Sequence, residues 1–362
     1  VGNGANQGIG YGFSEEGINS LFGSVELSYG GYLYLTATAR EDWFSTLNPE
    51  TNDILYPSFS LSYVFSDMLT MPSWISDGKF RAAWAQVGGA TSPYGTLLTY
   101  SLQGQGHLGY PLGRVSQGVI PNPNLKPLTK TDWEVGFDMN FLDYRLGLDI
   151  AYYQAVTTDD ILDATISIAS GFGGTKVNIG EMENKGIELL LTGTPVRSEL
   201  TWDIAVNFAV NNNNVNSLSE GITRLQVGQP RTRWAFIQHI VGEPYSSIVG
   251  FTHAEIDGQK VYDPLTVYPI ITDTLSLLGN GVHRYTGGIT NSFTWKNWNL
   301  SFLLDTKLDA EIYSGTNVRI TGWGLHQQTV DGRETGLEIN GVDPEGQPLN
   351  MTVDPEDVQG WW

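Results

Sequence analysis

The sequence predicts an all-β protein, an antiparallel up-and-down transmembrane β-barrel of which this chain holds about ten strands. Three observations predict it. Apolar and polar residues alternate over long stretches, short connections alternate with long ones along the chain, and the charged residues lie on one face of the predicted strands. Alternation with a period of two puts successive side chains on opposite faces of a strand. Short periplasmic turns and long extracellular loops are typical of outer-membrane barrels.

The clearest alternation covers residues 200–211. Every second residue from Leu200 to Val210 is apolar, and the residues between them are small or polar. With the stretch 184–193 it forms a predicted hairpin whose turn covers 194–199. In a soluble sandwich the apolar face of this hairpin would be the core, whereas in a barrel it would contact lipid, so the hairpin alone leaves both folds open.

Eight further strands are predicted from the same alternation, and they form pairs along the chain. The pairs are 22–29 with 32–41, 58–65 with 79–88, 130–141 with 145–153, and 284–295 with 300–306. Connections within pairs are short, and Gly30-Gly31 is a typical two-residue hairpin turn. Connections between pairs are long, with a loop from 157 to 179 and the longest loops at about 89–128, 212–283 and 309–362.

Composition excludes several functions. Only 19 Lys and Arg oppose 39 Asp and Glu, which gives a net charge of -20 and argues against nucleic acid binding. There is no cysteine, so disulfides and thiol catalysis are excluded. No apolar run is long enough for a transmembrane helix, so a membrane protein with this sequence must be a barrel.

The polar faces of the strands favour the barrel over a soluble β-sandwich. A barrel gives one face to lipid and the other to a watery or plugged lumen, so both the apolar and the charged rows are satisfied. We therefore expect the following residues to face the lumen: Asp132, Glu134, Asp138, Asp149, Glu188, Asp203 and Asn207.

Aromatic residues in the predicted loops are candidates for contacts with a substrate or a partner, because aromatic rings with a polar edge favour interfaces. Packing of the loops against each other, or a place in the aromatic girdle, is an equally good interpretation. The candidates are Trp43, Phe44, Tyr94, Tyr100, Tyr110, Trp234 and Phe236.

Other motifs have ordinary interpretations. The glycines at 104–109 match a dinucleotide fingerprint by letter, but no βαβ pattern surrounds them. The five histidines lack metal-ligand spacing, and the pair Asp159-Asp160 alone does not indicate a glycosidase. We expect no catalytic, cofactor-binding or metal residue, although carboxylates of the acidic tail could hold calcium.

Several stretches, taken together, resemble the SusC/RagA family of TonB-dependent outer-membrane transporters. They occur in order over most of the chain, and single pieces would be weak evidence. They are 32–42, 56–63, 79–88, Pro-Asn-Pro-Asn-Leu-Lys-Pro at 121–127 leading to 133–136, and 178–188 with Asn-Lys-Gly-Ile-Glu.

The resemblance implies a barrel of about 22 strands, filled by a plug and capped by a SusD-like lipoprotein. The implied function is TonB-dependent import of oligosaccharides or peptides across the outer membrane, without bond chemistry. We expect residues 1–362 to be part of one such barrel domain. We expect the closing strands and the plug to lie outside this chain, and TonB to act through that plug. The alternatives are a structural scaffold in an outer-membrane complex and a soluble carbohydrate-binding β-sandwich.

Overall fold

The structure is a computed structural model that describes residues 13–102, 106–115, 118–219, 221–228 and 234–362. The chain divides into two compact units. The first, which we call the sheet unit, contains Val1–Leu225 and Arg284–Leu308. The second unit contains Gln226–His283 and Asp309–Trp362.

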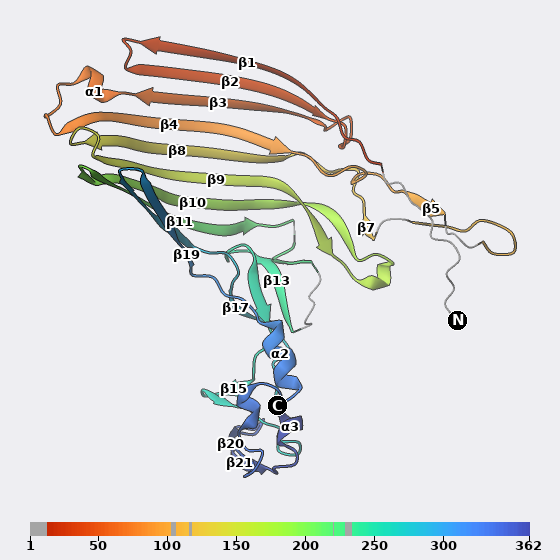
Figure 1. Cartoon of the computed structure of the whole chain (residues 1–362). Helices are drawn as coiled ribbons and strands as arrows, with labels where there is room; N and C mark the ends of the chain where they lie inside the picture. The colour runs from red at the N-terminus through yellow and green to blue at the C-terminus, as the bar shows by residue number, and fades with distance from the viewer. Residues whose placement is uncertain (1–12, 103–105, 116–117, 220, 229–233) are drawn as a thin grey trace. The chain divides into compact units, whose positions relative to one another are not determined.

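The sheet unit is built on ten long antiparallel strands in the order β1-β2-β3-β4-β8-β9-β10-β11-β18-β19 (Figure 1). The ten strands expected from the alternation, and their sequential pairing, are confirmed among the described residues. Their bounds are β1 (Ile18–Tyr29), β2 (Leu33–Phe44), β3 (Asp53–Tyr63), β4 (Ile75–Gly89), β8 (Leu128–Phe141), β9 (Leu146–Thr165), β10 (Gly174–Arg197), β11 (Leu200–Ser217), β18 (Tyr285–Trp295) and β19 (Trp298–Leu308).

The predicted loop at 157–179 is wrong, because β9 and β10 continue past the end of the apolar alternation and pair as far as Thr165 with Gly174. β11 likewise runs on through four asparagines to Ser217. These extensions surround a small buried cluster in which Ile179 and Val215 are almost inaccessible to solvent. Burial of this cluster stabilises strands whose polar sequence resembles loop.

The predicted loop after Glu41 also begins too early. β2 continues to Phe44, and β3 begins at Asp53 and includes Pro57. Phe44 is buried against Leu47 and Leu125, which explains why the strand continues. Two of the expected long loops are therefore short, covering only 45–52 and 166–173.

The pairing register gives the sheet two chemically different faces. Directly paired residues point to the same face, and the face changes with each step along a strand. One row across the sheet contains Phe59, Trp84 and Trp133, each paired with the next. The neighbouring row on the other face contains Ser58, Ala85 and Asp132. We call these the apolar face and the polar face.

The remaining elements of the sheet unit are short and lie between the long strands. They are α1 (Phe65–Met68), β5 (Tyr100–Leu102), β6 (Gly113–Val115), β7 (Val119–Ile120) and η1 (Ile168–Ser170), with β12 (Arg224–Val227) at the boundary of the unit. β5 pairs with β6, and β7 pairs in parallel with the start of β10.

The second unit has more regular structure than the sequence predicted for 212–283 and 309–362. β13 (Ala235–Ile240), β14 (Ser247–Gly250) and β17 (Ser276–Asn280) pair in an antiparallel manner. The tail, in which no strand was expected, contains the hairpin of β20 (Leu337–Val342) and β21 (Pro348–Val353). The other elements are β15 (Glu255–Ile256), β16 (Gln259–Lys260), α2 (Gly315–Gly322), η2 (Gln327–Val330) and α3 (Val358–Trp361).

A separate hydrophobic cluster holds the second unit together. Tyr262, Ile339, Val353 and Val358 are buried in it. Strand signals were missed here because the strands are short and pack against a small core rather than alternating over a bilayer. No helix in the described residues combines the length and the apolar character that a membrane span requires.

Candidate functional site

The polar face of the sheet gathers the charged residues that the sequence analysis singled out. The register puts all seven predicted lumen residues on this face. Asp138 and Asp149 are directly paired, and Glu188 is paired with Ala151 on the same face.

Arg81 connects three of these carboxylates. Its guanidinium donates to Glu134 at 3.1 Å, to Asp149 at 2.8 Å and to Asp138. Lys79 contacts the other oxygen of Asp138 at 2.6 Å. The planar guanidinium fork suits several carboxylates at once. We call these five residues the Arg81 cluster.

A glycine makes room for the Arg81 cluster. Gly136 is paired with Arg81, and a Cβ atom at Gly136 would lie 2.8 Å from the guanidinium carbon. The same arrangement recurs at Tyr153, whose ring lies over its paired residue Gly186. Glycine in these strands thus allows long polar side chains to lie flat along the face.

The other predicted lumen residues are not part of the cluster. Asp132 contacts Lys130 at 2.9 Å, while its Oδ1 atom is buried without a hydrogen-bond partner in the described residues. Asp203 accepts a hydrogen bond from Thr194 at 2.7 Å. Asn207 is paired with Leu190 and Gly288 on the same face, so the predicted residues form a row rather than one site.

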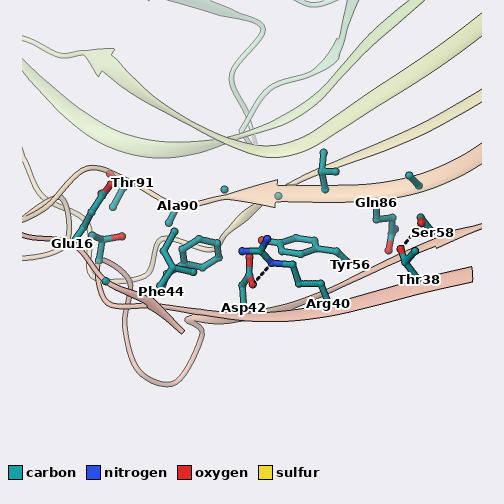
Figure 2. A pocket seen from close by; sticks show the side chains of 17 residues that line it. Glu16, Thr38, Arg40, Asp42, Phe44, Tyr56, Ser58, Gln86, Ala90 and Thr91 are labelled. Carbon is teal, nitrogen blue, oxygen red and sulfur yellow. Dashed lines mark hydrogen bonds and ion pairs between the residues drawn. The ribbon is translucent and has the colours of Figure 1, made fainter. Parts of the chain in front are cut away.

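A cavity of about 710 Å³ lies on the polar face near the ends of β2, β3 and β4 (Figure 2). Arg40 donates to Asp42 at 2.6 Å, and the hydroxyls of Thr38 and Ser58 are 2.5 Å apart. Figure 2 shows the Tyr56 ring beside the Arg40–Asp42 pair. The lining thus combines hydroxyl and charged groups, which can bind a polar molecule, with apolar residues such as Ile18, Phe44 and Val87.

Tyr56 has an unusual place in this cavity. Its hydroxyl is buried and has no hydrogen-bond partner in the described residues. The ring fits because position 88 is a glycine, where a Cβ would lie 2.7 Å from the ring and 2.6 Å from the carbonyl oxygen of Leu128. A buried hydroxyl without a partner carries a desolvation cost.

The predicted loop aromatics do not converge on one site. Trp43 and Phe44 belong to β2, so their prediction as loop residues is wrong, and Phe44 is buried in a hydrophobic cluster. The exposed candidates in the segment between β4 and β8 are Tyr94, Tyr100 and Tyr110. Trp234 and Phe236 belong to the second unit, where Trp234 lines a separate cavity.

Sequence reasoning missed Lys79, Arg81, Arg40 and Tyr56. The alternation in β4 already put Lys79 and Arg81 on the polar face, so attention to cations as well as carboxylates would have found them. Across the described residues, no three or more His, Asp or Glu side chains form a possible metal site. Calcium binding by the acidic tail stays a prediction, and residues 104 and 105 of the glycine-rich stretch lie outside the described residues.

The sequence of the chain is similar to a known protein family and to curated proteins. Residues 2–326 match the family described as TonB dependent receptor-like, beta-barrel. Among curated relatives, TonB-dependent receptor P26 of Formosa agariphila is 28% identical over 330 residues, which cover 82% of this chain and 32% of the relative. TonB-dependent receptor SusC of Bacteroides thetaiotaomicron is 26% identical over 326 residues, covering 81% of this chain and 31% of the relative.

The chain thus spans about a third of the length of these relatives. Among solved structures, the RagAB peptide transporter superposes with a TM-score of 0.75 at 17% identity, covering 94% of this chain and 38% of that chain. This supports the fold, and the resemblance to SusC and RagA inferred from the sequence motifs is confirmed. The chain belongs to the TonB-dependent receptor-like β-barrel family of the outer membrane.

Proposed function

We propose that the full-length protein imports oligosaccharides or peptides across the outer membrane, driven through TonB and assisted by a SusD-like surface lipoprotein. The observation that carries this proposal is the division of the ten-strand sheet into an apolar face and a polar face. In the proposal, the apolar face contacts lipid and the polar face lines the lumen.

The apolar face has the layout of a lipid-facing surface. Toward one end, Trp84 and Trp133 are paired, and the Trp133 ring lies 5.2 Å from that of Tyr152. Near the opposite end, Trp202 stacks on Phe293 with ring centroids 5.7 Å apart. Aromatic girdles at both interfaces are characteristic of outer-membrane barrels.

The height of the apolar band also suits a membrane. From Leu200 to Val210 the alternation in β11 continues for ten steps, or about 33 Å along the strand. With a strand tilt of about 40°, this corresponds to a band about 25 Å tall. Beyond this band the apolar face becomes polar, with Gln86 and Thr131 joined by a hydrogen bond of 3.2 Å.

The polar face offers groups that suit a hydrated passage. Cations pair with carboxylates within the face, in the Arg81 cluster and in the Arg40–Asp42 pair. Hydroxyl, amide and charged groups on this face can form hydrogen bonds with a sugar or a peptide as it passes. An apolar lumen would lack the donors and acceptors for these hydrogen bonds.

Substrate and partner classes come from the relatives. RagAB is described as a peptide transporter and SusC as a TonB-dependent receptor. By analogy with RagAB, peptides are one proposed substrate class. The oligosaccharide class and the SusD-like lid are proposed on the family resemblance of the sequence motifs. No bond chemistry is part of the proposed function.

The test uses the organism's own gene. Uptake of fluorescent oligosaccharides and peptides is compared in the wild type, a deletion strain, the complemented strain and a strain without TonB. We expect loss of uptake of one substrate class in the deletion and TonB-less strains and recovery on complementation. Purification of the tagged protein should also recover a surface lipoprotein. Unchanged uptake of every substrate in the deletion strain would refute import.

A further inference from the structure

The second unit contains a large open cavity that the sheet unit does not share. Its volume is about 1120 Å³, and every residue that lines it belongs to the second unit. Ligand cavities commonly measure about 300–1,000 Å³. The cavity is therefore large enough for an oligomeric ligand rather than a single small metabolite.

Five of the described residues that line the cavity are Trp, Tyr or Phe. Trp234 and Trp323 line it and remain 49% and 62% exposed. Phe251 and Tyr313 line it as well. Indole rings left this exposed offer flat apolar platforms next to a polar edge, which suits the alternating apolar and hydroxyl surfaces of sugar rings.

The charge of the lining is opposite to that of the chain. No Asp or Glu is among the described residues that line the cavity, although the chain has 39 Asp and Glu against 19 Lys and Arg. The lining instead contains one cation, Arg319. None of the ion pairs found among the described residues includes Arg319. A guanidinium in this position is free to bind a carboxylate or sulfate with two parallel hydrogen bonds.

A second group in the wall has an unused donor. Trp362 lines the cavity, and its indole Nε1 is buried without a hydrogen-bond partner in the described residues. A buried N–H without an acceptor is costly. An oxygen atom of a ligand would satisfy it.

The segment that carries Arg319 and Trp323 is held in place. Arg319 lies in α2, and its carbonyl accepts from the backbone N–H of Trp323 at 3.1 Å. Just beyond, Arg333 donates to the carbonyl oxygens of Gly324 and Thr329 at 2.5 and 2.6 Å. The cation and one aromatic platform are thus presented together, which reduces the ordering cost of binding.

We propose that this cavity binds an acidic oligosaccharide, with Trp234 and Trp323 stacking on sugar rings and Arg319 contacting a carboxylate or sulfate. The proposal deepens the proposed import function by naming the substrate class, and it rests on that function. Polar side chains in the lining, Thr252, Asn317 and Thr321, add hydrogen-bonding groups for sugar hydroxyls. These features favour a saccharide over an acidic peptide.

The test measures binding to the full-length protein in nanodiscs by isothermal titration calorimetry. The probes are tetragalacturonate, its methyl ester, a sulfated galactan tetramer and tetraglutamate. We expect Arg319→Gln and Trp323→Ala each to weaken binding of an acidic saccharide about tenfold or more. Arg319→Lys should recover part of the affinity, and the control Arg197→Gln at the end of β10 should leave it unchanged. The comparison of tetragalacturonate with the sulfated tetramer distinguishes carboxylate from sulfate.

Three results would overturn the proposal: no binding of either acidic saccharide, binding of the uncharged methyl ester as tight as that of the better-bound acidic saccharide, or tighter binding of tetraglutamate than of both acidic saccharides. Failure of the import function has a different signature. If uptake continues in the strain without TonB, import as proposed is wrong whatever the cavity binds. If TonB-dependent uptake holds but Arg319→Gln leaves binding of the acidic saccharides unchanged, only the proposal for this cavity fails.

Discussion

Arg81 and Gly136 face each other across β4 and β8, and the guanidinium of Arg81 occupies the space that a side chain at position 136 would need. This pairing leaves Arg81 lying along the polar face, where it reaches Glu134 on β8 and Asp149 on β9. The contacts of Arg81 with these carboxylates therefore depend on a residue that has no side chain.

Gly136→Ala should destabilise the protein. The added methyl group must push the guanidinium away from its carboxylates, and overpacking of this kind costs about 1–3 kcal/mol. Gly23→Ala in β1 is the matched control, because a Cβ there meets nothing within 4 Å. The free energy of unfolding is measured by urea denaturation of the full-length protein in lipid vesicles. Equal effects of the two substitutions would contradict the packing argument.

A double-mutant cycle then asks whether Gly136→Ala acts through Arg81. Arg81→Ala alone should cost about 1 kcal/mol, because Glu134 and Asp149, which are largely exposed, lose their donor while Asp138 keeps Lys79. In that background Gly136→Ala should become nearly harmless, so the two effects are not additive. Strict additivity would mean that the alanine clashes with something other than Arg81.

Tyr56→Phe should be neutral or slightly stabilising. The Tyr56 hydroxyl is buried without a partner in the described residues, so its removal ends a desolvation cost without breaking a hydrogen bond. The same denaturation assay checks this. A loss of more than about 1 kcal/mol would show that the hydroxyl has a partner, since that is the usual net worth of one hydrogen bond.

Trp202 and Asn291 form a hydrogen bond of 3.1 Å on the apolar face. In contact with lipid, Asn291→Ala would leave the indole N–H without an acceptor, at a cost of about 1–3 kcal/mol. Adding Trp202→Phe removes the unsatisfied donor. We therefore expect the double variant to lose less than the sum of the two single variants, and an additive result would contradict a hydrogen bond between them.

His253 should make the second unit less stable at mildly acidic pH. Burial, followed by the positive charge of Lys260, lowers the pKa of His253 below its ordinary value, while Glu255 opposes this. The unfolded state then binds the proton more readily, so stability is full above about pH 6.5 and is lost as the pH falls through the folded pKa.

Hydrogen exchange of the full-length protein, corrected for the intrinsic rate at each pH, checks this behaviour. Peptides covering 250–275 should lose protection between about pH 7 and 5.5. His253→Gln should remove most of that loss. Protection that rises on acidification in the wild type would show that the pKa of His253 is raised instead.

The alternation in sequence was sufficient to predict the ten strands, because along most of each strand nearly every second residue is apolar. It failed at the ends of β9, β10 and β11, where polar sequence stays in strand because the chain buries residues such as Ile179 and Val215 beside it. The pattern of neighbouring residues in the sequence does not show which residues pack together in this cluster.

The candidate sites were also predicted only in part. Glu134, Asp138 and Asp149 were predicted to share a face because they alternate within strands. Their convergence on Arg81 depends on the register between three strands, which sequence alone does not give. In the cavity of the second unit only Trp234 was among the predicted candidates. Arg319 was not predicted, since it lies far from Trp234 in the chain and no alternation connects the two.

The central claim is that the apolar face of the sheet contacts lipid and the polar face does not, and adjacent residues at the middle of β11 test it most directly. Val206 lies on the apolar face and Asn207 on the polar face. In urea denaturation of the full-length protein in lipid vesicles, Val206→Arg should cost about 2–4 kcal/mol and Asn207→Arg should cost far less. A larger loss for Asn207→Arg than for Val206→Arg would contradict the assignment of the two faces.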